Sequence, residues 1–166
     1  MKHFRDYLTE AKETGIHFEG DINASDCKQL ESLGNLKSVD GALFLYNCTA
    51  LKSLPNDLKV EVSLYLRNCT ALESLPSGLQ VNKTLILVNC TSLKSLPNGL
   101  IVGEDLWLNG CTALTELPSG LSVGEDLHLL GCTGLKSLPK DLKVGNRIYE
   151  ASNELREKYK GKYKFR

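Results

Sequence analysis

Six cysteines recur at a fixed interval of 21 residues along this chain of 166 residues. They stand at Cys27, Cys48, Cys69, Cys90, Cys111 and Cys132. A period of this length indicates one structural unit that is copied and stacked, so that each copy carries its cysteine in the same place. The sequence therefore predicts a solenoid, whose function has to be sought on its surfaces rather than in a pocket.

Five complete copies, from residues 39–59 to 123–143, share the pattern LxLxxCxxLxxLPxxL, and a degenerate first copy precedes them. Alternating leucines such as Leu106 and Leu108 predict a short strand with both side chains pointing inward. Leucines three apart, such as Leu114 and Leu117, predict a helical or 3₁₀-like turn that the following proline ends. We expect a stack of about six and a half rungs, in which each rung completes the core of its neighbours.

The cysteines are explained by their place in the repeat, so we expect reduced, buried thiols that weakly donate hydrogen bonds to carbonyls. Together with the lack of an apolar signal segment, this favours a reducing cytoplasm. Neither a CxxC pair nor a cysteine–histidine cluster at ligand spacing occurs, so we expect no metal and no cofactor. No base is placed to activate a thiol, and we expect no enzymatic activity.

Charge is balanced over the whole chain, with 20 basic and 20 acidic residues, which argues against a dedicated nucleic-acid binder. The balance hides an asymmetry, because residues 144–166 carry seven basic against three acidic side chains. No stretch is apolar and long enough to cross a membrane, so we expect no membrane partner.

The repeats over residues 18 to about 150 resemble the leucine-rich repeat family, in its short, LPxxL-bearing bacterial and phage form. The resemblance implies an α/β-type solenoid with a short parallel sheet on its concave face, and a binding scaffold as its function. We accordingly divide the chain into an N-terminal capping helix or targeting segment (1–17), the solenoid (18–152) and a C-terminal cap (153–166).

If the leucines fill the inside, the outward strand positions form columns across the concave sheet. One column is mostly large and apolar and includes the chain's single tryptophan, and interfaces favour aromatic residues and arginine. We predict a protein-binding surface made of Phe44, Tyr46, Tyr65, Arg67, Ile86, Trp107, His128 and Tyr149. The alternative is that β-propensity alone selects these residues.

The acidic pair Glu104–Asp105 recurs 21 residues later as Glu125–Asp126. It fits either a patch that faces a cation or a solvated edge of the solenoid. We favour the solvated edge.

Residues 2–14 place Phe4, Leu8 and Ala11 on one helical face, which predicts a helix that covers the first rung. The first ten residues, MKHFRDYLTE, also resemble the capsid-targeting propeptide of internal head proteins of T-even-type phages. That resemblance implies cleavage after Glu10 and packaging inside the virion.

The C-terminal segment KYKGKYKFR alternates lysine with aromatic residues, which predicts a final strand with Tyr159, Tyr163 and Phe165 on one face. Basic residues interleaved with aromatic ones also suit phosphate contact and base stacking. The candidates for such a nucleic-acid contact are Lys158, Lys160, Lys162, Lys164 and Arg166.

Our interpretation of the sequence is a non-enzymatic scaffold that binds another protein through the concave sheet. The setting it favours is a phage-encoded accessory factor that binds a bacterial host protein in the host cytoplasm. The alternative is an internal capsid protein, packaged with DNA in the virion interior, whose basic tail contacts nucleic acid.

Overall fold

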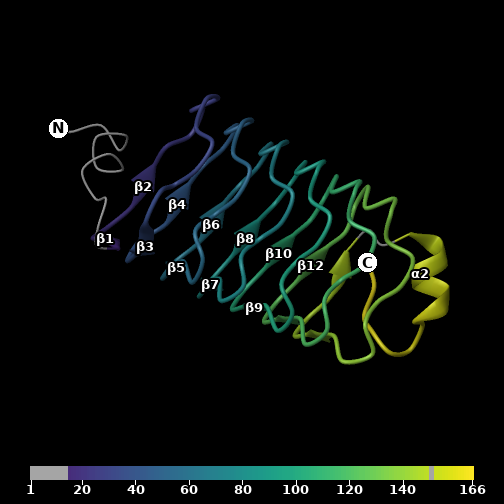
Figure 1. Cartoon of the computed structure of the whole chain (residues 1–166). Helices are drawn as coiled ribbons and strands as arrows, with labels where there is room; N and C mark the ends of the chain where they lie inside the picture. The colour runs from purple at the N-terminus through teal and green to yellow at the C-terminus, as the bar shows by residue number, and fades with distance from the viewer. Residues whose placement is uncertain (1–14, 150–151) are drawn as a thin grey trace.

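The computed structural model describes residues 15–149 and 152–166 and shows a parallel β-solenoid (Figure 1). The chain coils from one end of the stack to the other, and every coil repeats the one before it 21 residues later. The predicted N-terminal helix and the predicted cleavage site at Glu10 lie outside the described residues.

Two seven-stranded parallel sheets, here called sheet A and sheet B, run the length of the stack. Sheet A consists of β1 (Ile16–Phe18), β3 (Leu36–Val39), β5 (Lys59–Val60), β7 (Gln80–Val81), β9 (Ile101–Val102), β11 (Ser122–Val123) and β13 (Lys143–Val144). Sheet B consists of β2 (Ile22–Asn23), β4 (Leu43–Phe44), β6 (Leu64–Tyr65), β8 (Leu85–Ile86), β10 (Leu106–Trp107), β12 (Leu127–His128) and β14 (Ile148–Tyr149).

The interior is a continuous column of leucine and valine, as the repeat pattern predicts. Both leucines of the strand pattern, for example Leu64 and Leu66, are buried. The leucine three residues after each cysteine, for example Leu72, is buried as well. Strand pairing keeps every such leucine in register with its copy, as Leu106 with Leu127. A rung therefore has no core of its own and buries its leucines only against the rungs on either side.

The buried thiols act as hydrogen-bond donors, as the sequence predicts. Cys48, Cys69, Cys90, Cys111 and Cys132 each donate from Sγ to a backbone carbonyl oxygen of the preceding rung, at 3.0–3.1 Å. The acceptor of Cys69, for example, is the carbonyl of Leu45. This row of donors satisfies carbonyl groups in a place where water has no access.

Two expectations about the rungs are wrong. The sequence predicts one strand per rung and a single sheet. In the structure each copy has a second strand at its valine, and these strands form sheet A. A helical turn was expected between Leu114 and Leu117, but the described rungs contain only turns and extended chain there. Ser74 and Ser95 even form an isolated parallel bridge on this side. The leucines three apart point inward from extended chain that follows a turn.

The corner between the two sheets is only three residues long, as between β11 and β12. In the later rungs it begins with Gly103, Gly124 and Gly145. A Cβ at Gly124 would overlap the carbonyl oxygen of Gly103, and a Cβ at Gly145 would overlap that of Gly124. These glycines are therefore required by the close approach of successive backbones rather than by a turn conformation.

The turn after sheet B needs a left-handed residue just before each cysteine. Positive φ angles occur there at Asp26, Asn47, Asn68, Asn89, Gly110 and Gly131. The first four form a ladder of side chains, which we call the turn ladder. In it the amide of Asn68 donates to Asn47 at 2.7 Å and the amide of Asn89 donates to Asn68 at 3.0 Å.

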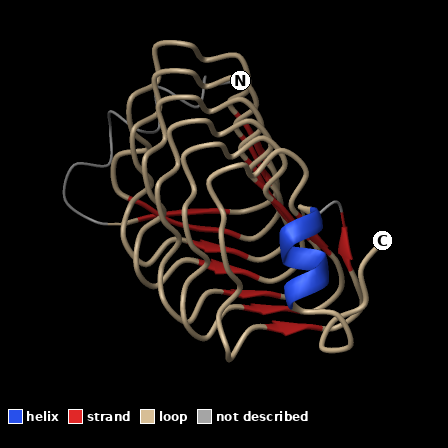
Figure 2. Cartoon of the chain, turned by 90° about the vertical axis from the view of Figure 1, so that its right-hand side faces the viewer, coloured by secondary structure: helices blue, strands red, loops and turns tan. Residues whose placement is uncertain are grey.

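The C-terminal segment covers the last rung, but residues 159–166 form isolated bridges instead of the predicted strand, and a helix precedes them. Helix α2 (Asn153–Lys158) starts at Ser152, whose hydroxyl accepts the N–H of Leu155, and Figure 2 shows this helix across the end of the coil. The hydroxyl of Tyr159 bonds both the N–H and the C=O of Leu138. The predicted packing of Tyr159, Tyr163 and Phe165 against the core is confirmed.

In the described part of the chain, no helix is long and apolar enough to cross a membrane.

Candidate functional site

The predicted binding residues lie together on the outer side of sheet B. The strand position between the two buried leucines supplies one file of side chains, which we call the aromatic column: Phe44, Tyr65, Ile86, Trp107, His128 and Tyr149. All are half-buried except His128, which is 9% exposed. The structure therefore brings the six positions into one file, as the spacing predicts.

Within this column the rings stack on one another along the axis of the solenoid. Phe44 and Tyr65 are parallel within 4° at a centroid distance of 4.7 Å. Trp107 lies 3.5 Å from His128, and His128 lies 4.8 Å from Tyr149. Ile86 separates the pair from the triplet.

Stacking along the axis decides which part of each ring meets solvent. The ring faces are directed at the neighbouring rungs, so the parts of the half-buried rings that meet solvent are mainly their edges. A flat ligand such as a sugar or a nucleobase cannot lie on a ring whose two faces are already covered. The column presents ring edges instead.

Beside the N-terminal part of the column lie Tyr46 and the exposed Arg67. The ring of Tyr46 contacts both Phe44 and Tyr65, at centroid distances of 6.1 and 5.6 Å. Burial, followed by the nearby Tyr65, raises the pKa of Tyr46, so its hydroxyl stays a donor at neutral pH. A shallow hollow opens here, bordered by Tyr46, Arg67 and Ile86.

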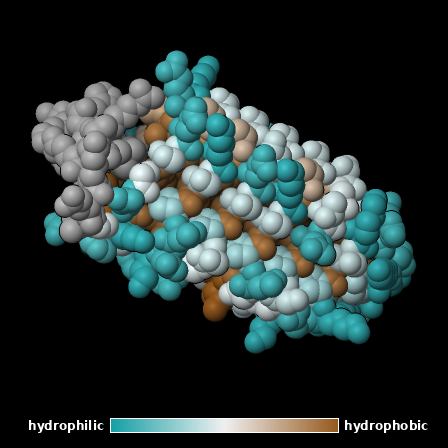
Figure 3. Space-filling model, viewed as in Figure 1, coloured by the Kyte–Doolittle hydropathy of each residue, from teal (hydrophilic) through white to brown (hydrophobic). Residues whose placement is uncertain are grey.

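The surface around these features is mixed rather than uniformly apolar. On the side of the molecule shown in Figure 3, apolar atoms appear as narrow strips between hydrophilic side chains. Among the described residues, the exposed large apolar side chains are Leu130 on the sheet B side, at 52%, and Ile101 in sheet A, at 66%. Single exposed residues of this kind do not amount to an apolar patch.

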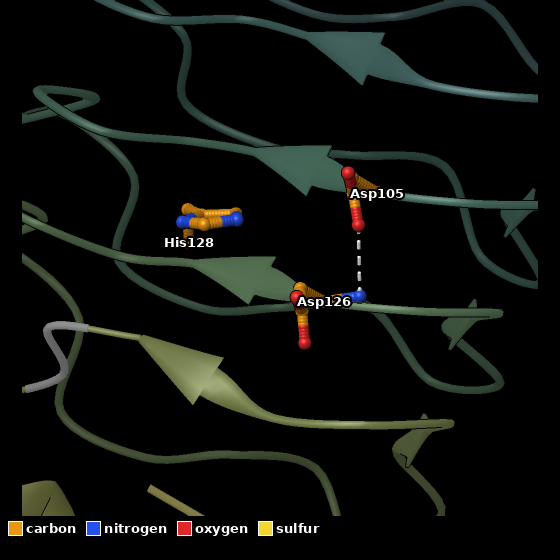
Figure 4. A group of neighbouring side chains, drawn as sticks. All are labelled: Asp105, Asp126 and His128. Atoms are coloured by element: carbon orange, nitrogen blue, oxygen red, sulfur yellow. Dashed lines mark hydrogen bonds between the residues drawn. The ribbon is translucent and has the colours of Figure 1, made fainter. Parts of the chain in front are cut away.

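The second member of each acidic pair lies near a histidine. Asp105 and Asp126 lie on neighbouring rungs of sheet B, close to His128 (Figure 4). Oδ1 of Asp105 accepts the N–H of Asp126, and Oδ1 of Asp126 accepts the N–H of Arg147, both at 3.0 Å. One ligand atom from each of the three side chains lies within 4.8 Å of the others.

The five buried thiols have raised pKa values. Burial raises the pKa of Cys48 and Cys132 to about 11 and that of Cys69 and Cys111 to about 12. Burial also raises the pKa of Cys90. A thiol is reactive as its thiolate, and these groups stay protonated.

The basic residues of the C-terminal cap are exposed, while the aromatic rings between them are not free to stack on bases. Tyr163 and Phe165 pack against the core, and the hydroxyl of Tyr163 donates to the carbonyl of Leu142. The side chain of Lys162 donates to the carbonyl of Lys140. The exposed basic side chains are Lys158, Lys160, Lys162, Lys164 and Arg166.

Arg166 is also a part of the aromatic column that the sequence does not predict. Its guanidinium lies over the ring of Tyr149, 5.9 Å from the centroid, in a cation–π contact. No sequence signal links these residues, because the contact depends on how the cap folds back. The turn ladder, by contrast, can be predicted from the sequence. The residue before each of the six repeat cysteines is Asp, Asn or Gly, and these residues tolerate a left-handed conformation.

No protein-family model matches this chain, and neither the curated proteins nor the solved structures yield a match. The resemblance to leucine-rich repeats therefore rests on the repeat pattern alone.

Proposed function

We propose that this chain is a non-enzymatic scaffold that binds another protein through the outer side of sheet B. The observation that carries the proposal is the aromatic column, with Tyr46 and Arg67 beside it. Tyrosine, tryptophan and arginine are the residues most enriched where protein interfaces concentrate their binding energy. Here they occupy one continuous side of a rigid rod.

Stacking makes this side suitable for tight binding. Side chains that are free in solution lose about 0.5–1.5 kcal/mol each when an interface immobilises them. The rings of Tyr65 and Trp107 are already held between neighbours, so most of that loss has been incurred on folding. Their hydroxyl and indole N–H donors suit backbone carbonyls and carboxylates, which favours an extended polypeptide as the partner.

The protonated thiols support a non-enzymatic role. The repeat pattern supports membership in the leucine-rich repeat family, whose members bind through a parallel sheet. The first ten residues support a phage origin, and we propose a phage-encoded accessory factor whose partner is a bacterial host protein in the cytoplasm.

A double substitution on sheet B tests the binding side. Tyr65→Asp with Trp107→Asp should reduce capture of the host protein from lysate at least tenfold, because it introduces charge at the centre of the column. Gln80→Asp with Ile101→Asp makes the same change on sheet A and should leave capture unchanged. Circular dichroism confirms that both variants remain folded. Equal capture by the parent and the sheet B variant would contradict the proposal.

A milder pair guards against a loss that comes from unfolding. Tyr46→Ala and Arg67→Ala alter the side chains beside the column and leave the ring stacks in place. Each should weaken capture by several-fold without changing the melting temperature by more than a few degrees. If neither weakens capture, the N-terminal part of sheet B is not the site.

The second candidate function is an internal virion protein whose C-terminal cap contacts packaged DNA. Its supporting observation is the set of five exposed basic side chains on the cap. Because the rings between them are packed inward, contact would be with phosphates alone and would weaken steeply as salt rises. Lys160→Gln, Lys164→Gln and Arg166→Gln together should then abolish DNA binding at low salt, and DNA binding equal to that of the parent would exclude this candidate.

A further inference from the structure

Asp105, Asp126 and His128 converge on one point of sheet B. Asp126 and His128 are two residues apart, one immediately before and one within β12, so they project from the same side of the strand. Asp105 stands directly opposite Asp126, because Leu106 pairs with Leu127. Figure 4 shows the two carboxylates one above the other, with His128 farther along the strand. We propose that these three side chains bind one divalent transition-metal ion of the zinc class.

The charge arrangement favours a cation at this point. Like charges directly opposite on adjacent strands are destabilising. Asp105 and Asp126 form such a pair, whereas the same column in the preceding rungs carries the uncharged Ala42, Ser63 and Thr84. The next residue in the column is Arg147, which is exposed.

The distances require only a small adjustment. Zinc binds carboxylate oxygen and imidazole nitrogen at about 2.0–2.2 Å, which places tetrahedral ligand atoms roughly 3.4 Å from one another. The three ligand atoms lie within 4.8 Å of one another, so they have to approach by up to about 1.4 Å. Both carboxylates are half-exposed and able to rotate, and each has a second oxygen besides the Oδ1 that accepts a backbone N–H.

His128 gives the site its selectivity and its rigidity. The imidazole is held between Trp107 and Tyr149, so its nitrogens have a fixed direction along the ring edge. An imidazole ligand favours zinc and similar ions over calcium and magnesium, which prefer oxygen ligands alone. Three protein ligands on an outer surface leave the fourth position to water.

The single tryptophan of the chain is a built-in probe of this site. Trp107 lies 3.5 Å from the imidazole of His128, so a metal ion bound to that ring changes the indole fluorescence. Titration of the full chain with Zn²⁺ should give a saturable change with a micromolar midpoint. Ca²⁺ at the same concentrations should neither reproduce the change nor compete with it.

Three variants and one matched control assign the signal. Asp105→Asn and Asp126→Asn keep the hydrogen bond to the next rung and should each weaken Zn²⁺ binding at least tenfold. His128→Phe keeps an aromatic ring in the stack and should abolish the effect. The control is Asp21→Asn, since Oδ1 of Asp21 accepts the N–H of Ala42 in the same column at 2.7 Å, but Ala42 follows it instead of a second acid.

Each result of these titrations either supports or overturns the metal site. Loss of binding in the three variants and full binding in Asp21→Asn support the site. No saturable fluorescence change up to millimolar Zn²⁺, or binding that is equal in all variants, overturns it. Displacement of Zn²⁺ by equimolar Ca²⁺ also overturns it, because it would show an acidic patch in which the imidazole takes no part.

Discussion

The N-terminal and C-terminal halves of the solenoid share one interior and differ over most of their exterior. Up to Ile101 the corners carry Asp40, Glu61 and Asn82, and the turns carry asparagine. From Val102 onward the corners and the turns carry glycine. The same coil is thus maintained in one half by hydrogen-bonded polar side chains and in the other by the absence of side chains.

The two halves of sheet B differ in the same way. The N-terminal half has the Phe44–Tyr65 pair with Tyr46, and beside it a column with the single acid Asp21 followed by Ala42, Ser63 and Thr84. The C-terminal half has the Trp107–His128–Tyr149 stack with two aspartates beside it. The comparison teaches that a repeat constrains what points inward, whereas each outward position is free to take on a separate role.

Both halves contain buried thiols, and the largest expected effect acts on them. We expect alkaline pH to destabilise the fold. The thiols of Cys69 and Cys111 have a pKa raised to about 12 by burial, from an ordinary value of 9.0. Above about pH 9 the unfolded chain loses thiol protons that the folded chain keeps, so stability is complete below pH 9 and falls as pH rises. Each such thiol lowers the free energy of unfolding by up to about 1.4 kcal/mol per pH unit.

Urea unfolding under reducing conditions at pH 8, 9 and 10 measures this fall. Cys111→Ala should give a shallower dependence on pH, because one buried thiol has been removed. A free energy of unfolding that is flat over this range would contradict the buried thiol ladder.

The second prediction separates the halves at their corners. Gly124→Ala should destabilise the fold by about 3 kcal/mol, because the new methyl group overlaps the backbone of the preceding rung and over-packing forces the chain to shift. Asn82→Ala, at the equivalent corner of the N-terminal half, removes only a hydrogen bond to Glu61 and should cost about 1 kcal/mol or less. Thermal unfolding of both variants measures the difference, and similar losses would refute it.

The smallest effect is expected at the turns. Asn68→Ala removes two hydrogen bonds of the turn ladder and places alanine at a φ of 61°, which should cost about 1–2 kcal/mol. Asn68→Gly keeps the backbone conformation and should cost about 1 kcal/mol less. Chemical denaturation distinguishes the two, and equal losses would show that the hydrogen bonds rather than the backbone angle stabilise the turn.

The sequence predicts the interior well, because leucine, valine and cysteine recur in positions that only a stacked coil can bury together. It does not predict sheet A. From β5 onward the strands there are two residues long, and they include Lys59, Gln80 and Ser122, which have no strong preference for strands. Their pairing follows from the register that sheet B and the core impose, and that is a property of neighbouring rungs rather than of one segment.

For the candidate site, the period predicts the aromatic column but not how its rings are oriented. The rings stack because adjacent strands are close enough for the rings of neighbouring rungs to lie face to face instead of facing solvent. The grouping of Asp105, Asp126 and His128 is concealed by the spacing, since the first is separated from the other two by a full period. The alternation of lysine and aromatic residues over 158–166 predicts a strand, whereas the tyrosines of the cap are fixed by hydrogen bonds to the last coil that the pattern does not encode.

The described hydrogen bonds and ring contacts between the cap and the solenoid fall on its last stretch, between Leu138 and Tyr149. Tyr159 bonds Leu138, Tyr163 bonds Leu142, and Ile148 pairs with Phe165. None of these contacts depends on the number of coils that precede the last one. Duplication or removal of a segment such as 60–80 would lengthen or shorten the molecule by one strand spacing of about 4.8 Å. The length of the solenoid can therefore change only in steps of one coil. Evolution or design can add or remove whole coils while the C-terminal cap remains the same.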